Sequence, residues 1–352
     1  MPDEPQLHLF QASDRAEVLD FIREVFPPEV STRLIAQWAW RYEGSPFTLP
    51  EGPDVTFIRA GPKVVGLSAG YRLQMWMGGI ESTAEARGAW VVHPDYRGRD
   101  LWRKAGRVPH PFAPIQFGWS RLPPYVGARF NRFTDQVRPL VRVLDAGPLV
   151  ENFAHSPLLA SIAGAASTAL RIASSPLRRA RGTVVRLDAF DERVDRLWER
   201  ARRPTNAMIV RNHQYLNWRY CRRPDATYNL YAVERGSELD GFLVARPTTY
   251  RGMRWGYLVD FLAPQNAREV MASLVDAALD DFRRAGLTAV TCYATDPAAR
   301  GALYRAGFFP APQRSPIGFM RRMSPKRADL AKFTELKLWY LTAGDGDLEM
   351  AP

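Results

Sequence analysis

The feature that most constrains this chain is that its two halves run through the same order of predicted elements, without close sequence identity. Each half begins with helices and continues with a β-meander. A crossover then leads to a strand, a helix and a strand. This order predicts an α+β fold with one crossover in each sheet, and it excludes a repeated βαβ barrel and a Rossmann double winding.

Local signals set the limits of these elements. In the first half we expect helices at 13–26 and 33–42 and strands at 55–59, 63–73, 79–92, 115–119 and 140–144. In the second half we expect helices at 194–201, 215–220, 268–285 and 296–305 and strands at 228–234, 241–247, 255–262, 289–293 and 317–323. Gly286 is placed to end one of these helices, and Asp296 followed by Pro297 is placed to begin the next.

The length of 352 residues predicts two domains, each large enough for its own core. We predict an N-terminal domain at 1–147 and a C-terminal domain at 183–352. Each is expected to be a mixed, mostly antiparallel sheet flanked by helices. The segment 148–182 between them is rich in alanine and serine and then in arginine, so it is predicted to be a connector helix followed by a basic linker.

Composition narrows the class of protein. Hydrophobic residues make up 46% and charged residues 24%, which is ordinary for a globular chain and argues against disorder. Two cysteines are too few for a disulfide scaffold or a four-thiolate zinc site, and the five histidines show no ligand spacing, so we expect no metal. Neither a secretion signal nor a membrane span is evident, so a cytoplasmic protein is expected.

The basic residues are concentrated in one segment. The formal net charge is +11, and residues 171–223 alone contain 14 arginines against five acids. Such a segment could meet phosphates, an anionic membrane surface or an acidic partner. The chain has no RNA-binding aromatic signature that would select nucleic acid among these partners.

A turn with a distinctive composition follows the predicted strand that ends at Val91 and Val92. It reads His93-Pro94-Asp95-Tyr96-Arg97-Gly98-Arg99, and the whole segment resembles the strand-to-loop motif of the GCN5-related N-acetyltransferase (GNAT) superfamily. In that family, backbone amides at this loop hold the pyrophosphate of acetyl-CoA. The resemblance implies acetyl-CoA or another acyl-CoA as cosubstrate, bound by Val91, Val92, Arg97, Gly98, Arg99, Asp100, Leu101 and Trp102.

The second half carries another trait of this family. The segment 296–308 is similar to the family's "N-x-x-A-x-x-L-Y-x-x-x-G-F" run, in which the tyrosine, here Tyr304, often protonates the leaving CoA thiolate. The resemblance therefore covers most of the chain as two GNAT-like halves. Tandem folds of this kind are also used by Fem-type transferases, which take aminoacyl groups from tRNA.

The sequence departs from the family pattern at the loops. Asp100 and Trp102 stand where the family has glycines, and they add a negative charge and bulk where the backbone should be bare. In the second half the segment 262–268 replaces the glycine loop altogether. Neither half therefore combines an intact donor motif with an intact tyrosine motif.

Two acidic residues are further candidates for catalysis. Glu85 lies in the strand that leads to the loop, where a carboxylate could deprotonate an amine, or could simply be an exposed strand position. Asp260 lies inside the apolar run 258–262, so it needs either a partner or a function. The segment 217–224 mixes aromatic residues with arginines, which fits either an acceptor cleft or helix packing.

These features predict an acyltransferase that moves an acyl group from CoA to an amine, or to a hydroxyl, of a small-molecule or sugar-linked acceptor. Positioning of the two reactants supplies much of the rate in such a reaction, which agrees with the absence of a nucleophile motif. Two alternatives stay open: a Fem-like transferase that uses aminoacyl-tRNA, and a non-catalytic binding protein with the GNAT fold.

Overall fold

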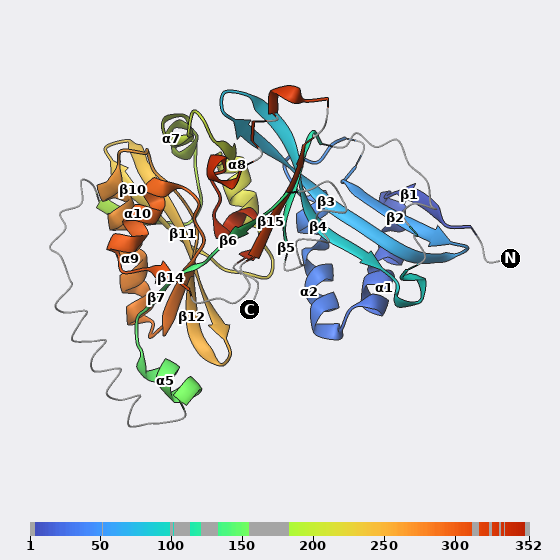
Figure 1. Ribbon diagram of the computed structural model, residues 1–352, viewed down its shortest axis with the longest axis horizontal. Coiled ribbons are helices and arrows are strands. Elements are labelled where there is room, and N and C mark those ends of the chain that lie inside the picture. The colour runs from blue at the N-terminus through green and yellow to red at the C-terminus, as the bar shows by residue number, and fades with distance from the viewer. Residues whose placement is uncertain are drawn as a thin grey trace.

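The computed structural model consists of two β-sheets, each flanked by helices (Figure 1). It describes residues 4–50, 52–98, 101, 113–120, 133–154, 183–311, 317–323, 326–330, 332–333 and 335–348. Both sheets are mostly antiparallel, and among the described strands each contains one parallel pair. The predicted α+β class, with two mixed sheets and flanking helices, is confirmed.

The first sheet has the strand order β1-β2-β3-β4-β5-β15-β6, and β9 pairs with the end of β3. Its strands are β1 (Gln6–Leu9), β2 (Val55–Ala60), β3 (Lys63–Met77), β4 (Glu81–Val92), β5 (Ile115–Ser120), β6 (Phe133–Val137), β9 (Ala207–Ile209) and β15 (Ile317–Met323). Its helical elements are η1 (Ala12–Asp14), α1 (Arg15–Val25), α2 (Pro28–Trp38), η2 (Ala39–Glu43) and η3 (Pro94–Tyr96). The helix α1 packs on β3, which is buried along most of its length.

The second sheet has the strand order β14-β7-β13-β12-β11-β10-β8. Its strands are β7 (Leu140–Val143), β8 (Thr183–Leu187), β10 (Asn229–Arg235), β11 (Glu238–Tyr250), β12 (Met253–Leu262), β13 (Ala289–Cys292) and β14 (Phe309–Pro310). Its helical elements are α5 (Gly147–Ala154), α7 (Arg193–Ala201), α8 (His213–Leu216), η4 (Asn217–Cys221), α9 (Arg268–Arg284) and α10 (Pro297–Arg305). The helix α9 packs across the sheet, and α10 packs on α9.

The two halves of the sequence contribute strands to each other's sheet, and besides β9 two longer strands are exchanged. The strand β7 comes from the first half and pairs with β13 and β14 of the second sheet. The strand β15 comes from the second half and lies between β5 and β6 of the first sheet. The predicted limits 1–147 and 183–352 thus describe halves of the sequence, and backbone hydrogen bonds tie each half into the other's sheet.

Two local predictions about helix ends are confirmed. Gly286 follows α9 with a φ of +68°, a conformation that glycine adopts without steric cost. The side chain of Asp296 accepts a hydrogen bond of 2.9 Å from the backbone N–H of Ala299 and so caps α10. These residues fix where the crossover helix between β12 and β13 ends and where α10 begins after β13.

The halves meet at a reciprocal pair of tryptophans. The indole Nε1 of Trp40 donates to the carbonyl of Trp218 at 2.7 Å, and the indole Nε1 of Trp218 donates to the carbonyl of Trp40 at 2.9 Å. The two rings stack with centroids 5.2 Å apart. Each tryptophan lies in a π-helical turn, η2 or η4, within the same tripeptide Trp-Arg-Tyr. The two halves therefore use the same tripeptide, in the same kind of turn, where they contact each other.

Candidate functional site

The strands β4 and β5 are paired over only part of their length. The parallel ladder joins Ala84 to Ile115, Glu85 to Gln116 and Ala86 to Phe117. The strand β4 continues to Val92 with β3 on one edge, and no described strand pairs with its other edge beyond Ala86. Because unpaired backbone groups on a strand edge can bind an extended chain, this stretch of β4 is a candidate ligand platform.

Glu85 lies at the start of this divergence. It is 1% exposed, and its Oε2 accepts a hydrogen bond of 2.7 Å from Nε2 of Gln116 on β5. Its other oxygen faces Gly70 on β3, where any Cβ would overlap the carboxylate. Glu85 is therefore buried within the sheet, and the absence of a side chain at Gly70 leaves room for its carboxylate.

The turn after β4 is described up to Gly98. Arg97 is exposed, and its Nε donates to the carbonyl of Val92 at 3.3 Å. Gly98 has a φ of +75° and open space where a side chain would stand. Leu101 is buried and packs beside Gly66 in a small cluster with Ile58 and Val65. Three other predicted donor residues, Arg99, Asp100 and Trp102, lie outside the described residues.

A small apolar pocket of about 10 Å³, with room for about one water molecule, lies against Ala89 of β4. Its walls are Ile22 of α1, Phe26 just after α1, Leu34 and Trp38 of α2, and Leu67 of β3, and its polar groups are Gln37, Arg41 and Tyr42. Arg41 donates to Oε1 of Gln37 at 2.8 Å and forms an ion pair with Asp347. Burial raises the pKa of Tyr42, so its hydroxyl stays protonated at neutral pH. The pocket borders the strand that leads into the turn.

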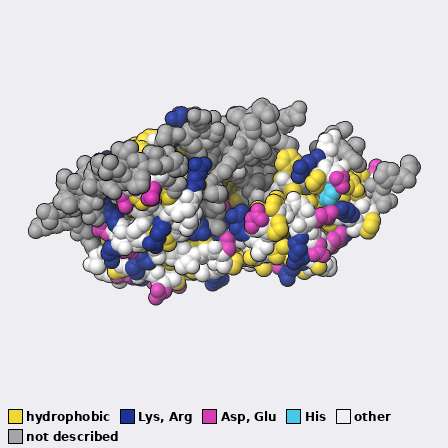
Figure 2. Space-filling view, turned by 90° about the horizontal axis from the view of Figure 1, so that it is seen from below, with side chains coloured by type: hydrophobic (Ala, Val, Ile, Leu, Met, Phe, Trp, Pro, Cys, Tyr) yellow, Lys and Arg dark blue, Asp and Glu magenta, His cyan; other side chains and the backbone are white. Residues whose placement is uncertain are grey.

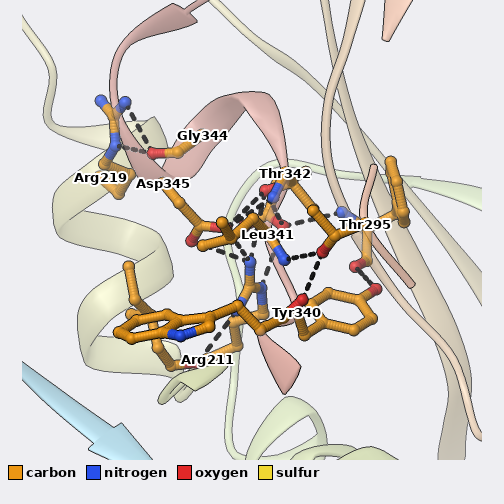
Figure 3. Close-up of polar contacts among 12 residues, drawn as sticks. Arg211, Arg219, Thr295, Tyr340, Leu341, Thr342, Gly344 and Asp345 are labelled. Carbon is orange, nitrogen blue, oxygen red and sulfur yellow. Dashed lines mark hydrogen bonds and ion pairs between the residues drawn. The ribbon is translucent and has the colours of Figure 1, made fainter. Parts of the chain in front are cut away.

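The corresponding gap in the second sheet is filled by the C-terminal segment 335–348, which begins with η6 (Leu336–Leu338) and contains η7 (Ala343–Asp345). The parallel ladder of β12 and β13 ends at Leu258 and Cys292. Beyond it, the Tyr340 hydroxyl donates to the carbonyl of Phe261 at 2.6 Å, and Thr342 forms a bridge with Ala294 (Figure 3). The C-terminal segment thus occupies the space in which these two strands diverge.

Asp260 joins a buried ionic cluster at the C-terminal segment. Its Oδ1 accepts from Nε of Arg211 at 3.0 Å and its Oδ2 from the Tyr220 hydroxyl at 2.8 Å. Arg211 also donates to Asp345 at 2.9 Å (Figure 3). Burial, opposed by Arg211 and assisted by Asp260, raises the pKa of Asp345 to about 6. The acid in the apolar strand therefore has a partner, and that pairing fixes the C-terminal segment.

A second cluster contains the arginines of both Trp-Arg-Tyr tripeptides. Asp347 accepts from Arg219 at 2.6 Å and from Arg223 at 2.7 Å, and it pairs with Arg41. Although burial acts in the opposite direction, these three guanidinium groups hold the pKa of Asp347 well below its usual range. In the segment 217–224, Trp218, Arg219 and Tyr220 are buried, so this part of it packs between the halves.

Tyr304 lies apart from Glu85. Its side chain is 43% exposed on α10, and its hydroxyl is hydrogen-bonded to Arg300 one turn earlier. In Figure 1, α9 and α10 cover the side of the second sheet that is turned away from the first. The three predicted catalytic residues are therefore not brought together: Glu85 belongs to the first sheet, and Asp260 and Tyr304 to the second.

Sequence reasoning missed Arg211 and Asp345, which fix the C-terminal segment, and Asp347, which pairs with arginines of both halves. One signal was present, because Trp-Arg-Tyr occurs at 40–42 and again at 218–220. The acids that complete the two clusters follow no such pattern. Over the described ranges, no group of three or more His, Cys, Asp or Glu residues could hold a metal ion, and no helix is long and apolar enough to cross a membrane.

Comparisons with known proteins bear on the fold. No family model matches the sequence, and no curated protein matches it. Among solved structures, Saccharomyces cerevisiae N-myristoyltransferase with bound myristoyl-CoA is similar over 92% of this chain and 85% of that chain, with a TM-score of 0.54 and 12% identity. The chain has the tandem GNAT fold.

Two further solved structures are similar to this chain. A GCN5-related N-acetyltransferase from Kribbella flavida covers 92% of this chain and 71% of its own, with a TM-score of 0.53 and 16% identity. A probable N-acyltransferase from Enterococcus faecalis V583 covers 91% of this chain and 72% of its own, with a TM-score of 0.54 and 10% identity. At these identities the similarity establishes the GNAT fold, and function must be argued from the site.

Proposed function

We propose that this tandem GNAT protein is an acyltransferase that moves an acyl group from acyl-CoA to an amine, or to a hydroxyl, of a small-molecule acceptor. The observation that carries the proposal is the early end of the β4–β5 ladder. Beyond Ala86 the edge of β4 has no described partner, and the strand leads directly into the turn at Arg97 and Gly98. An extended pantetheine chain needs such an edge, and its diphosphate needs such a turn.

The donor is proposed to bind along this edge. Pantetheine lies beside Val91 and Val92, and the diphosphate lies at the turn of Arg97 and Gly98, whose open space lets a phosphate approach the backbone. Arg97 is exposed, and its positive charge would attract the diphosphate of the donor. The sequence motif adds four further residues to the proposed site, namely Arg99, Asp100, Leu101 and Trp102.

The acceptor is proposed to approach along the unpaired edge of β4, since the pocket beside Ala89 has room for only about one water molecule. Glu85 takes the proton from the attacking amine through water. The amine nitrogen bonds to the thioester carbon, and the carbon–sulfur bond breaks. The proton that Glu85 took returns through water to the sulfur, which leaves as the CoA thiol.

The first sheet is the one proposed to react. In the second sheet, Tyr340 and Thr342 lie where pantetheine would have to pass between β12 and β13. Asp260 is enclosed by Arg211 and Tyr220, and Tyr304 is remote from β4. The reaction at β4 therefore uses neither Asp260 nor Tyr304.

Calorimetric titration with acetyl-CoA and with longer acyl-CoAs tests donor binding. We expect saturable binding that weakens about tenfold or more in Arg97→Ala/Arg99→Ala, since each charge-assisted contact contributes roughly 1.5–3 kcal/mol. Arg235→Ala/Arg284→Ala is the matched control, because both arginines are exposed and lie on the second sheet and α9. Equal binding by the two double variants would refute the phosphate assignment. Binding of aminoacyl-tRNA in place of acyl-CoA would favour the Fem-like alternative.

Acyl transfer by Glu85→Gln tests the proposed base. The variant should bind acyl-CoA normally and turn over about 100-fold more slowly or worse, since a general base contributes roughly 10²–10⁴-fold. Glu81→Gln is the control, because Glu81 is an exposed glutamate on the same strand. Full activity of Glu85→Gln would remove Glu85 from the mechanism and leave donor binding unaffected.

A further inference from the structure

His93 lies between the strand β4 and the turn that carries Arg97 and Gly98. It is 7% exposed, and its backbone N–H donates to the carbonyl of Val65 at 3.0 Å, so it is the residue at which the chain leaves the sheet. Its imidazole Nδ1 accepts a hydrogen bond of 3.2 Å from the backbone N–H of Asp95. The ring therefore caps the start of η3, which is the first part of the turn.

The other ring nitrogen of His93 meets two charged side chains. Its Nε2 lies 3.1 Å from Oε1 of Glu24 on α1 and 3.3 Å from Nζ of Lys63 on β3. A neutral imidazole has one N–H and one acceptor nitrogen. Because Nδ1 accepts from Asp95, the proton lies on Nε2 and is donated to Glu24. The contacts thus select one tautomer of the ring, the one that can cap the turn.

Glu24 and Lys63 hold this tautomer from the surface of the protein. Charged side chains of both signs lie close together on the surface, as the face in Figure 2 shows, and these two form such a pair at 2.7 Å. An exposed ion pair stabilises a protein little by itself. Hydrogen bonds from Lys63 and then from His93 lower the pKa of Glu24, so its carboxylate stays ionised and accepts from both. The pair therefore acts mainly through the ring that it orients.

Two further hydrogen bonds close the backbone of the turn. The N–H of Tyr96 donates to the carbonyl of His93 at 3.0 Å, and the N–H of Arg97 donates to the carbonyl of Pro94 at 3.2 Å. The Tyr96 ring meets the imidazole edge-on, with centroids 5.9 Å apart. Three consecutive N–H groups are thus used inside the turn, and a side chain holds the first of them. Arg97 therefore leaves a turn whose shape is fixed before any ligand binds.

We propose that His93 is a positioning residue for the acyl donor: its Nδ1 holds the turn in the shape in which Arg97 and Gly98 receive the diphosphate. This inference rests on the proposed function of β4 and the turn, and it gives His93 no contact with the donor. A turn that samples several shapes binds only through the competent fraction, and the apparent affinity falls by that fraction. The loss of one side-chain cap corresponds to about a fivefold change in such an equilibrium.

Calorimetric titration of acetyl-CoA into His93→Ala and His93→Asn tests the proposal. Alanine removes the acceptor, so the dissociation constant should rise about fivefold while the number of binding sites stays at the wild-type value. Asparagine is a strong capping residue whose Oδ1 can accept from the N–H two residues further on, so His93→Asn should bind within about twofold of the wild type. His213→Ala is the matched control and should bind as the wild type does, because His213 lies on α8 in the second half and pairs with Asp195.

Three results overturn the proposal while the donor site itself stands. Equal binding by His93→Ala and the wild type would show that the turn needs no cap. Equal weakening in His93→Ala and His93→Asn would assign the effect to packing of the ring and not to its acceptor nitrogen. Fewer sites in His93→Ala at an unchanged dissociation constant would show a role in folding alone. A wild type that binds no acetyl-CoA would instead refute the proposed donor site, and the role of His93 with it.

Discussion

Replacing Asp345 with asparagine is expected to change how the free energy of unfolding depends on pH. Asp345 and Asp260 are both buried and share the single guanidinium of Arg211, so the cluster has one carboxylate more than it has cations. Burial and the second carboxylate raise the pKa of Asp345 from 3.8 to about 6, against the effect of Arg211. The folded protein therefore keeps a proton that the unfolded chain releases.

The sign and size of the pH dependence of the free energy of unfolding follow from this difference in pKa. Because the folded value is the higher one, the stability that Asp345 contributes is fully present below pH 3.8 and is lost as the pH rises through about 6. A difference of about two pKa units corresponds to about 3 kcal/mol, at about 1.4 kcal/mol per unit. Asparagine does not titrate, so the variant lacks this dependence.

Urea unfolding of both proteins between about pH 7.5 and about pH 5 measures the effect. As the pH falls, the wild type should gain stability relative to Asp345→Asn, by up to about 1.4 kcal/mol per pH unit. Asp347→Asn is the control: the pKa of Asp347 is lowered, so its contribution is lost only as the pH falls below the usual aspartate range. The argument from burial would be refuted if the difference in the free energy of unfolding between the wild type and Asp345→Asn did not change with pH. It would also be refuted if acid stabilised the variant relative to the wild type.

Three glycines give further predictions. Gly346→Ala should lower the free energy of unfolding by about 1–3 kcal/mol in urea titrations, because a Cβ there would overlap the indole of Trp119; a variant as stable as the wild type would contradict this. Gly301→Ala, inside α10 with only the far end of an arginine nearby, should instead raise that free energy by about 0.5–1 kcal/mol, and a loss would show strain there. Gly70→Ala should displace the Glu85 carboxylate and reduce acyl transfer while acyl-CoA binding persists; unchanged turnover would contradict the role of Glu85.

Much of the candidate site could be placed from the sequence because it follows continuous segments. The strand ending at Val92, the turn at Arg97 and Gly98, and Glu85 on the same strand are local features. The pocket beside Ala89 could not be placed, because its walls come from α1, α2 and β3. Asp260 illustrates the limit: its apolar neighbours showed that it needed a partner or a function, but Arg211 is 49 residues away.

The sequence by itself determined the α+β class, the order of the longer elements and the ends of helices such as α9 and α10, because periodicity and capping act between residues a few positions apart. The short strands β1, β6, β8, β9 and β14 were not predicted. Only the tertiary structure decided that β7 and β15 are exchanged between the halves. It also decided that the C-terminal segment occupies the space in which β12 and β13 diverge. Strand pairing and ion pairing join residues far apart in the chain, and the choice of partner depends on which surfaces are buried together. The composition of a single segment does not contain that information.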